Sequence, residues 1–310
     1  MPHSIVSIGM ATIDHLYRLK DVSHLPEGRV TEYSIQGGGP AATAAAAIAR
    51  LGANCGLITT VGDDQRGQDA LSGLEEYGVD VSKSVVKDGA TPMVLVLVDA
   101  QTGERHFLAL QTNPPRVDAD DIDWDYVSEA QIVHIDNWIP DATTVLKKAH
   151  ELGKTTMIDT EFREDHDSGY FPYLDVYVAG SDRPEWRENP PRAIEETERI
   201  VDQGPHTAIL TLGCAGCAGV GPEGPFHVNG FEVDVVDTCG TGDVFHGSYA
   251  WALNQGWTAR QCAVFASATA AISATCLGGR AGLPPAEKVA HFLKSRGQTG
   301  PWEQIETDEQ

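Results

Sequence analysis

The sequence predicts an α/β fold with a mostly parallel central sheet and a small separate β-sheet lid. β-branched segments alternate with helical segments along most of the 310 residues, as expected when helical crossovers connect parallel strands. Two neighbouring apolar runs near residues 92–110 interrupt this alternation and predict a β-hairpin. No linker or low-complexity tract divides the chain, so we expect a single domain over residues 1–310.

The N-terminal part predicts strands and helices in a regular order. A β-branched run ending in glycine predicts a buried first strand at residues 4–9, and VTEYSIQ predicts a strand at residues 30–36. Three glycines and a proline then open a run of small helix formers over residues 37–53. A strand at residues 55–64 and a helix at residues 67–79 should follow.

The hairpin comes next, from residues 92–99 and 104–110 on either side of AQTG. With the strand near residue 30 it should form the lid, whose strands lie within about 15–36 and 92–111. The alternation then resumes with strands at residues 131–136, 155–160, 174–180 and 207–213, and with helices at residues 142–153 and 193–204.

The charge balance limits the partners. The chain has 22 Lys and Arg against 45 Asp and Glu, a formal net charge of −23, and such an acidic surface argues against nucleic acid and anionic membranes. No apolar run approaches the roughly 18 residues that span a bilayer, and the first residues lack a signal-peptide pattern. We expect a cytoplasmic protein whose six scattered cysteines are reduced.

The most informative segment lies at residues 233–256. A β-branched run, Val233 to Val236, leads into Asp-Thr-Cys-Gly-Thr-Gly-Asp, and a helix is predicted from Val244 to Leu253. The glycines allow consecutive N–H groups to point outward at a helix N-terminus, which is an anion cradle. Asp243 could there accept a proton from a hydroxyl that attacks a bound phosphate. A plain glycine turn with Asp243 as an N-terminal helix acid explains a bare GxGD equally well.

The complete string DTCGTGDVFHG resembles the DTxGAGD signature of the ribokinase-like, or PfkB, sugar kinases. Further segments resemble that family in the same order: GMATID at residues 9–14, GGGPAATAAAAIARLG at 37–52, VGDDQRGQDALSGLEEYGVDV at 61–81, TLGCAG at 211–216 and AVFASATAAISATCLGGRAGLP at 263–284. The resemblance implies a ribokinase-like three-layer sandwich and an ATP-dependent phosphotransferase that acts on an alcohol group. It also implies a small sugar and ATP as ligands, with Mg²⁺ on the ATP phosphates.

By this resemblance, Asp243 is the catalytic base, and the backbone N–H groups of Gly240, Thr241 and Gly242 form the anion hole. The implied substrate-binding residues are Asp14, Gly37, Gly38, Gly39, Asn137 and Arg163. The implied ATP-binding residues are Thr211, Gly213, Gly216 and Ser267. Some family members bind a monovalent cation such as K⁺ near the turn that corresponds to Asp237 and Cys239, and the sequence leaves this open here.

Several positions depart from the family pattern. Ala42 stands where a sugar-binding Asn is common. In the segment that corresponds to Asn-x-x-Glu, Ser181 replaces the Asn and Glu185 is one residue out of step. Arg163 can equally be a surface ion-pair residue.

The closest resemblance is to sulfofructose kinases, so a fructose-like ketose or 6-deoxy-6-sulfofructose is the favoured substrate. Recognition of a sulfonate needs Arg or Lys. The strand at residues 131–136 ends instead in Asp136 and Asn137, and Arg29 and Arg105 of the lid are the remaining candidates. A nucleoside kinase of the same family, or a catalytically weak sugar- or nucleotide-binding relative, is the alternative.

Three other patterns have simpler explanations. GVGPEG at residues 219–224 predicts a hairpin turn, because a strand-like segment follows where a dinucleotide-binding helix would begin. Cys214 and Cys217 form a C-x-x-C without a second pair, which favours a structural role. His134 is expected to pack in the core. His246, three residues after Asp243, is also expected to pack, with contact to substrate or phosphate as the alternative. The apolar runs of the lid favour a homodimer that forms through it.

Overall fold

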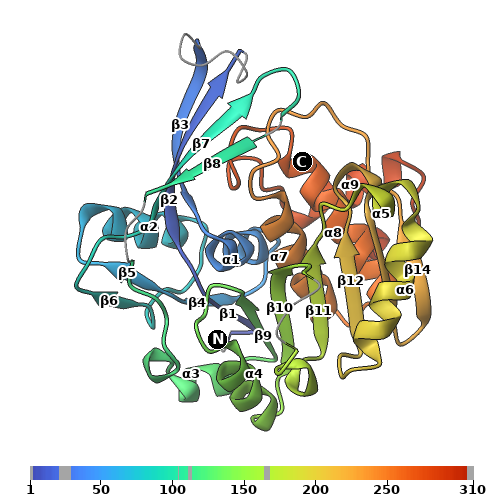
Figure 1. Cartoon of the computed structure of the whole chain (residues 1–310), viewed down its shortest axis with the longest axis horizontal. Helices are drawn as coiled ribbons and strands as arrows, with labels where there is room; N and C mark the ends of the chain where they lie inside the picture. The colour runs from blue at the N-terminus through green and yellow to red at the C-terminus, as the bar shows by residue number, and fades with distance from the viewer. Residues whose placement is uncertain (1–2, 21–28, 104, 111–113, 164–167, 306–310) are drawn as a thin grey trace.

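The computed structural model describes residues 3–20, 29–103, 105–110, 114–163 and 168–305, and the chain folds around one large sheet (Figure 1). Its eight strands lie in the order β14-β13-β12-β11-β10-β9-β1-β4. From β12 to β4 all neighbours are parallel, and β13 and β14 add an antiparallel hairpin. The strands are β1 (Ile5–Ile8), β4 (Cys55–Ile58), β9 (Ile132–Asp136), β10 (Thr155–Glu161), β11 (Val176–Gly180), β12 (Thr207–Thr211), β13 (Cys217–Gly221) and β14 (Gly224–Val228).

Helices cover both faces of this sheet and make it the middle of three layers. Alternate residues of one strand enter different cores: Ile5 of β1 packs in one hydrophobic cluster, Val6 and Ile8 in the other. The first cluster is shared by α1 (Pro40–Arg50), α7 (Thr241–Asn254), α8 (Ala259–Ser273) and α9 (Ala286–Ser295), and the second by α3 (Trp124–Ser128), α4 (Ala142–Glu151), α5 (Pro184–Glu188) and α6 (Pro190–Val201). No helix in the described ranges is long and apolar enough to cross a membrane.

The lid is a separate four-stranded sheet in the order β3-β2-β7-β8 that projects from the body (Figure 1). It comprises β2 (Thr12–Leu19), β3 (Val30–Gly38), β7 (Met93–Asp99) and β8 (Arg105–Ala109). Leu16, Val96 and Val98 on one face pack against Cys239 and Leu277 of the body. Beside the lid lie α2 (Gln65–Glu76) and the two-stranded sheet of β5 (Thr60–Gly62) and β6 (Val85–Lys87).

The predicted fold class is confirmed, and so is the hairpin turn at GVGPEG, which connects β13 to β14. Two local predictions were wrong or incomplete. Residues 233–236 form no strand, because the N–H groups of Val236 and Asp237 donate to the Ala274 carbonyl at the end of α8. Strand β2 was missed as a separate element, since its apolar residues Ile13, Leu16 and Leu19 recur at every third position and lack the alternation typical of a strand.

Helix α7 lies very close to α1. Except at its ends, α1 consists of buried alanine, threonine and isoleucine residues. A Cβ added to Gly247 of α7 would overlap the main-chain atoms of Ala44, including its carbonyl oxygen. Gly247 therefore fixes the distance between the two helices, and with it the place of the α7 N-terminus.

We predict that Gly247→Ala destabilises the protein. Backbone atoms of α1 cannot move aside as a flexible side chain would, so overpacking costs about 1–3 kcal/mol and outweighs the gain in helix propensity. Urea unfolding measures the change.

Gly73→Ala in α2 is the matched control, since a Cβ there meets nothing within 4 Å. This variant should gain about 0.5–1 kcal/mol from helix propensity. Equal effects of the two substitutions would contradict close α1–α7 packing as the constraint.

Candidate active site

The N-terminus of α7 forms an open cradle of backbone N–H groups. Gly240 precedes the helix with φ 71°, and a Cβ on it would lie 2.7 Å from the Gly279 Cα. No side chain caps the helix, and open space surrounds the Cβ position of Gly242. The first-turn N–H groups of an uncapped helix are well suited to bind an anion. Of the three predicted anion-hole residues, Thr241 also donates its N–H to the Thr238 carbonyl, at 3.4 Å.

Asp243 lies in the first turn of α7, next to this cradle. Part of its surface stays exposed, but burial of the rest and the negative charge of Asp159 raise its pKa to about 8, while His246 opposes the shift. Asp14 and Asp136 raise the pKa further. The site thus concentrates carboxyl groups, and Asp243 exchanges its proton near neutral pH, which suits a general base.

His246 holds this part of α7 in place. Its Nδ1 lies 2.6 Å from the Gly242 carbonyl oxygen and 3.3 Å from Asp159 Oδ2, and its Nε2 lies 3.2 Å from the Val178 carbonyl oxygen. Burial lowers its pKa. These contacts are to protein groups on all sides, which agrees with the packing role predicted for His246. His134 is also buried, with Nδ1 3.2 Å from Ser7 Oγ.

Asp14 and the glycines at residues 37–39 come together where β2 and β3 leave the lid. The Thr12 hydroxyl donates to Asp14 Oδ1 at 2.7 Å, and burial raises the pKa of Asp14. The Asp14 carboxylate occupies the space where a Cβ of Gly38 would be. This close approach requires glycine, so at least Gly38 of the predicted substrate loop has a defined structural reason.

Sequence reasoning missed Arg280 as an individual residue. It is buried; its Nη2 donates to the Gly38 carbonyl at 2.7 Å, and its Nε to Thr43 Oγ1 at 3.4 Å. Burial lowers its pKa to about 10, so it remains charged at neutral pH. Its charge also opposes the raised pKa of Asp14. The signal was present in GGRAGLP, where a lone Arg stands among glycines.

Asp237 organises the turn before α7. Its Oδ1 accepts from the Cys239 N–H and its Oδ2 from the Gly278 N–H, each at 2.8 Å. Arg105 of β8 reaches the same turn, because its Nη1 donates to Thr238 Oγ1 at 2.8 Å. The lid is thereby connected to the cradle. Cation binding near Asp237 and Cys239 stays a prediction.

Asp136 ends β9 and binds three backbone N–H groups. Its Oδ2 accepts from Met10 at 2.7 Å and from Ala41 at 3.2 Å, and its Oδ1 accepts from Trp138 at 2.9 Å. Burial raises its pKa to about 6. Asp136 therefore fixes the segments that follow β1 and β9 and the start of α1, a structural role that the sequence pattern did not reveal.

The predicted nucleotide-side residues lie at the carboxyl end of β12, which pairs in parallel with β11. Thr211 ends β12, and Gly213 and Gly216 have φ 60° and 90°. Ser267 of α8 is buried, with its hydroxyl 3.8 Å from Cys217 Sγ. In the altered Asn-x-x-Glu segment, the Ser181 N–H donates to the Thr211 carbonyl at 3.0 Å. Cys214 and Cys217 are free thiols, the first exposed and the second buried, and their structural role stays a prediction.

Other predicted residues are not gathered into this arrangement. Asn137 is exposed after β9, and Arg29 is exposed before β3. The Arg163 side chain is 70% exposed and pairs with Glu161 at 3.5 Å. Ala42 is fully buried in α1. Throughout the described ranges, no three His, Cys, Asp or Glu side chains are placed to hold a metal ion.

Comparison with known proteins identifies a consistent group. The model of the pfkB family carbohydrate kinases matches residues 2–286. The chain is 32% identical over 284 residues to an ATP-dependent ribose-1-phosphate kinase of Halopiger xanaduensis, covering 89% of this chain and 94% of that protein. It is 27% identical to an aminoimidazole riboside kinase of Salmonella typhimurium, covering 83% and 88%. A ribokinase structure from Thermotoga maritima superposes with a TM-score of 0.79 at 26% identity, covering 94% and 99%.

The raised pKa of Asp243 predicts a pH-dependent effect on stability. The folded protein keeps this proton up to about pH 8, whereas the unfolded chain loses it above about pH 4, so rising pH favours unfolding across that window. Asp243→Asn removes this pH-dependent loss of folding stability, because the amide does not ionise. Its melting temperature should therefore exceed that of the wild type by more at about pH 8 than at about pH 5.

Asp234→Asn is the control, because it makes the same charge change on an exposed loop residue. An equal stability change of Asp243→Asn at both pH values would contradict the raised pKa.

Proposed function

The chain belongs to the pfkB family of carbohydrate kinases, and from this premise we propose that it transfers the γ-phosphoryl group of ATP to a hydroxyl of a small sugar with Asp243 as the general base. The observation that supports this proposal most directly is the position of Asp243, a carboxyl group of raised pKa in the first turn of an uncapped helix. It combines a proton acceptor and an anion cradle within one helical turn.

The reaction needs few groups from the protein. The sugar oxygen attacks the γ-phosphorus, its proton passes to the Asp243 carboxylate, and the bond to the β-phosphate oxygen breaks to release ADP. The N–H groups of Gly240, Thr241 and Gly242 are proposed to stabilise the negative charge of the transferred group. Asp14 and the loop Gly37, Gly38 and Gly39 are proposed to orient the sugar, with Arg280 fixing the loop from behind.

ATP is proposed to lie between the α7 cradle and the loop of Thr211, Gly213 and Gly216. A cavity lined by His227, Asn229, Phe231, Arg260 and Arg296 adjoins that loop and offers space for the base. Mg²⁺ is proposed to be held mainly by the ATP phosphates and water. When bound, Mg²⁺ neutralises phosphate charge; a K⁺ near Asp237 and Cys239 would act beside the same cradle.

The identity of the sugar substrate is a more specific proposal. The sequence pattern favours a fructose-like ketose or 6-deoxy-6-sulfofructose, and the Halopiger relative points to ribose 1-phosphate. Two of these three are anionic. The Salmonella relative keeps a riboside, and thus a nucleoside kinase, as the second candidate. A panel of fructose, sulfofructose, ribose 1-phosphate and adenosine, read by ADP release, separates them. Binding without ADP release from any compound would favour a binding protein.

We also propose that two copies associate through the outer face of the lid. Paired residues of neighbouring strands share a face, so Tyr33, Ile35 and Leu108 lie opposite the face that packs on the body. All three are exposed in the single chain. Burying such a surface against a second lid would remove apolar area from water.

We predict that Asp243→Asn lowers kcat by about 10²–10⁴-fold, because the amide cannot take the proton of the attacking hydroxyl. KM for sugar and ATP should change little, since the shape of the site is kept. Coupled ADP-release kinetics measure both constants, with Asp234→Asn as the charge control. Wild-type turnover by a folded Asn variant would exclude Asp243 as the base.

We predict that Leu108→Asp weakens dimerisation, because it places a charge in the proposed apolar interface. Analytical ultracentrifugation over a concentration series should show a shift toward monomer. Val86→Asp in β6 is the control, because Val86 is 56% exposed and Leu108 55%, but Val86 lies outside the lid. A wild-type monomer, or equal effects of the two variants, would refute a lid-mediated dimer.

A further inference from the structure

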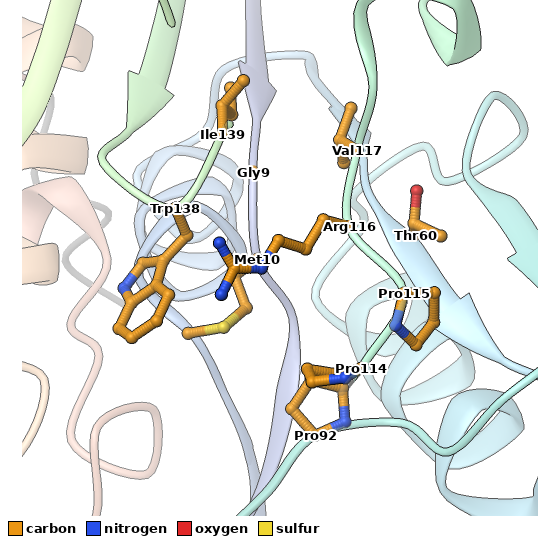
Figure 2. A pocket seen from close by; sticks show the side chains of 10 residues that line it. All are labelled: Gly9, Met10, Thr60, Pro92, Pro114, Pro115, Arg116, Val117, Trp138 and Ile139. Carbon is orange, nitrogen blue, oxygen red and sulfur yellow. The ribbon is translucent and has the colours of Figure 1, made fainter. Parts of the chain in front are cut away.

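A small pocket opens beside the segments that Asp136 holds. Ten residues line it, among them Gly9 and Met10 after β1, Trp138 after β9, and Arg116 (Figure 2). Ligands of open parallel sheets bind at the carboxyl ends of the strands, and β1 and β9 both end here. Met10 leads directly into β2, which carries Asp14. Met10 also packs against the proposed sugar loop, because a Cβ added to Gly39 would overlap the Met10 carbonyl, so the pocket adjoins the proposed sugar site.

The lining is apolar except for two side chains. Met10, Pro92, Pro114, Pro115, Val117 and Ile139 contribute apolar surface, and none of the ten lining residues is acidic. The guanidinium of Arg116 points across the pocket toward Trp138, with its Cζ 5.8 Å from the ring centre (Figure 2). Thr60 is buried, and its hydroxyl has no hydrogen-bond partner among the described residues. Arg116 is exposed, and its guanidinium remains available to a ligand.

Arg116 has no carboxylate partner among the described residues, although acidic residues are close in sequence. These acidic residues pair with Lys87 instead, whose Nζ lies 3.0 Å from Asp118 Oδ2 and 2.6 Å from Asp121 Oδ2. Lys87 also donates to the Arg116 carbonyl at 3.3 Å. The loop is thus anchored by another cation, which leaves the guanidinium of Arg116 to the pocket.

The wall of the pocket is also held in place. The N–H groups of Met10 and Trp138 both bind the Asp136 carboxylate, at 2.7 and 2.9 Å. Gly9, with φ 151°, allows this because a Cβ there would overlap the same carboxylate. The three N–H donors offset the negative charge of Asp136 on this side, so it need not repel an anion at Arg116.

We propose that this pocket is a subsite for a phosphate or sulfonate substituent of the sugar, bound by the guanidinium of Arg116 at the end remote from the reacting hydroxyl. This proposal rests on the proposed sugar-kinase function. A planar guanidinium matches the geometry of such oxyanions. The cation–π contact with the Trp138 ring limits its rotation and lowers the entropic cost of binding.

The test compares matched neutral and anionic sugars: fructose with fructose 6-phosphate and 6-deoxy-6-sulfofructose, and ribose with ribose 1-phosphate. Binding is measured by calorimetry without ATP, and turnover by ADP release. The wild type should bind at least one anionic sugar more tightly than its neutral counterpart. Arg116→Gln should weaken that binding by about 10- to 100-fold, as loss of a charged hydrogen bond implies. It should leave the neutral sugar unchanged, and Arg116→Lys should restore part of the affinity.

Arg199→Gln is the matched control, because Arg199 lies on α6 in a surface pair with Glu196. The phosphate and sulfonate sugars identify which oxyanion fits. No preference of the wild type for any anionic sugar, or equal weakening of neutral and anionic sugars by Arg116→Gln, would overturn the subsite. Anion-selective binding without ADP release would support the subsite and refute the kinase function, so the two failures are distinguishable.

Discussion

Repulsion among four carboxyl groups is the constraint around which the site is built. Asp14, Asp136 and Asp159 each raise the pKa of Asp243, so the fold must hold mutually repelling groups together. It does so with backbone N–H groups on Asp136, the Thr12 hydroxyl on Asp14, and the nearby charge of Arg280. Asp159 receives less help: among the described residues its one ion-pair partner is His246, at 3.3 Å, and burial raises its pKa well above the usual range. Burial, and after it the repulsion by these carboxylates, gives Asp243 a pKa suited to proton transfer.

Close packing of small residues makes this arrangement possible. The alanines of α1 and Gly247 of α7 bring the two helices together, which sets the first turn of α7 above β10 and its Asp159. Gly240 and Gly279 similarly bring the turn before α7 against the segment that contains Arg280. At both contacts, glycine leaves out the side chain that would keep the two backbone segments apart. The glycines act mainly by permitting close approach, and positive φ is required only at some of them, including Gly240.

The sequence predicted the fold class, the hairpin at residues 219–224 and the position of Asp243 at a helix start, because these depend on local pattern and on one extended motif. It did not predict the role of Asp136, Asp159 or Arg280. Their partners are distant in the chain, as with Arg280 and Gly38 or Asp136 and Met10, and a lone Asp at a strand end carries no local signal. The strand predicted from Val233 to Val236 was wrong for the same reason. These residues have high β propensity, but the N–H groups at the end of the segment donate to the distant Ala274 carbonyl.

The net charge of −23 opposes the binding of anionic ligands, but distance limits this repulsion. At physiological ionic strength, exposed charges are screened beyond about 8 Å, so acidic residues on the far surfaces contribute little field at the site. Nearby groups decide instead. The α7 N–H cradle, Arg280 behind the sugar loop, Arg105 on the Thr238 turn and Arg116 in its pocket come from four separate segments. An acidic chain can therefore handle phosphate, because cations and N–H groups closer to the ligand than the screening length outweigh distant surface carboxylates.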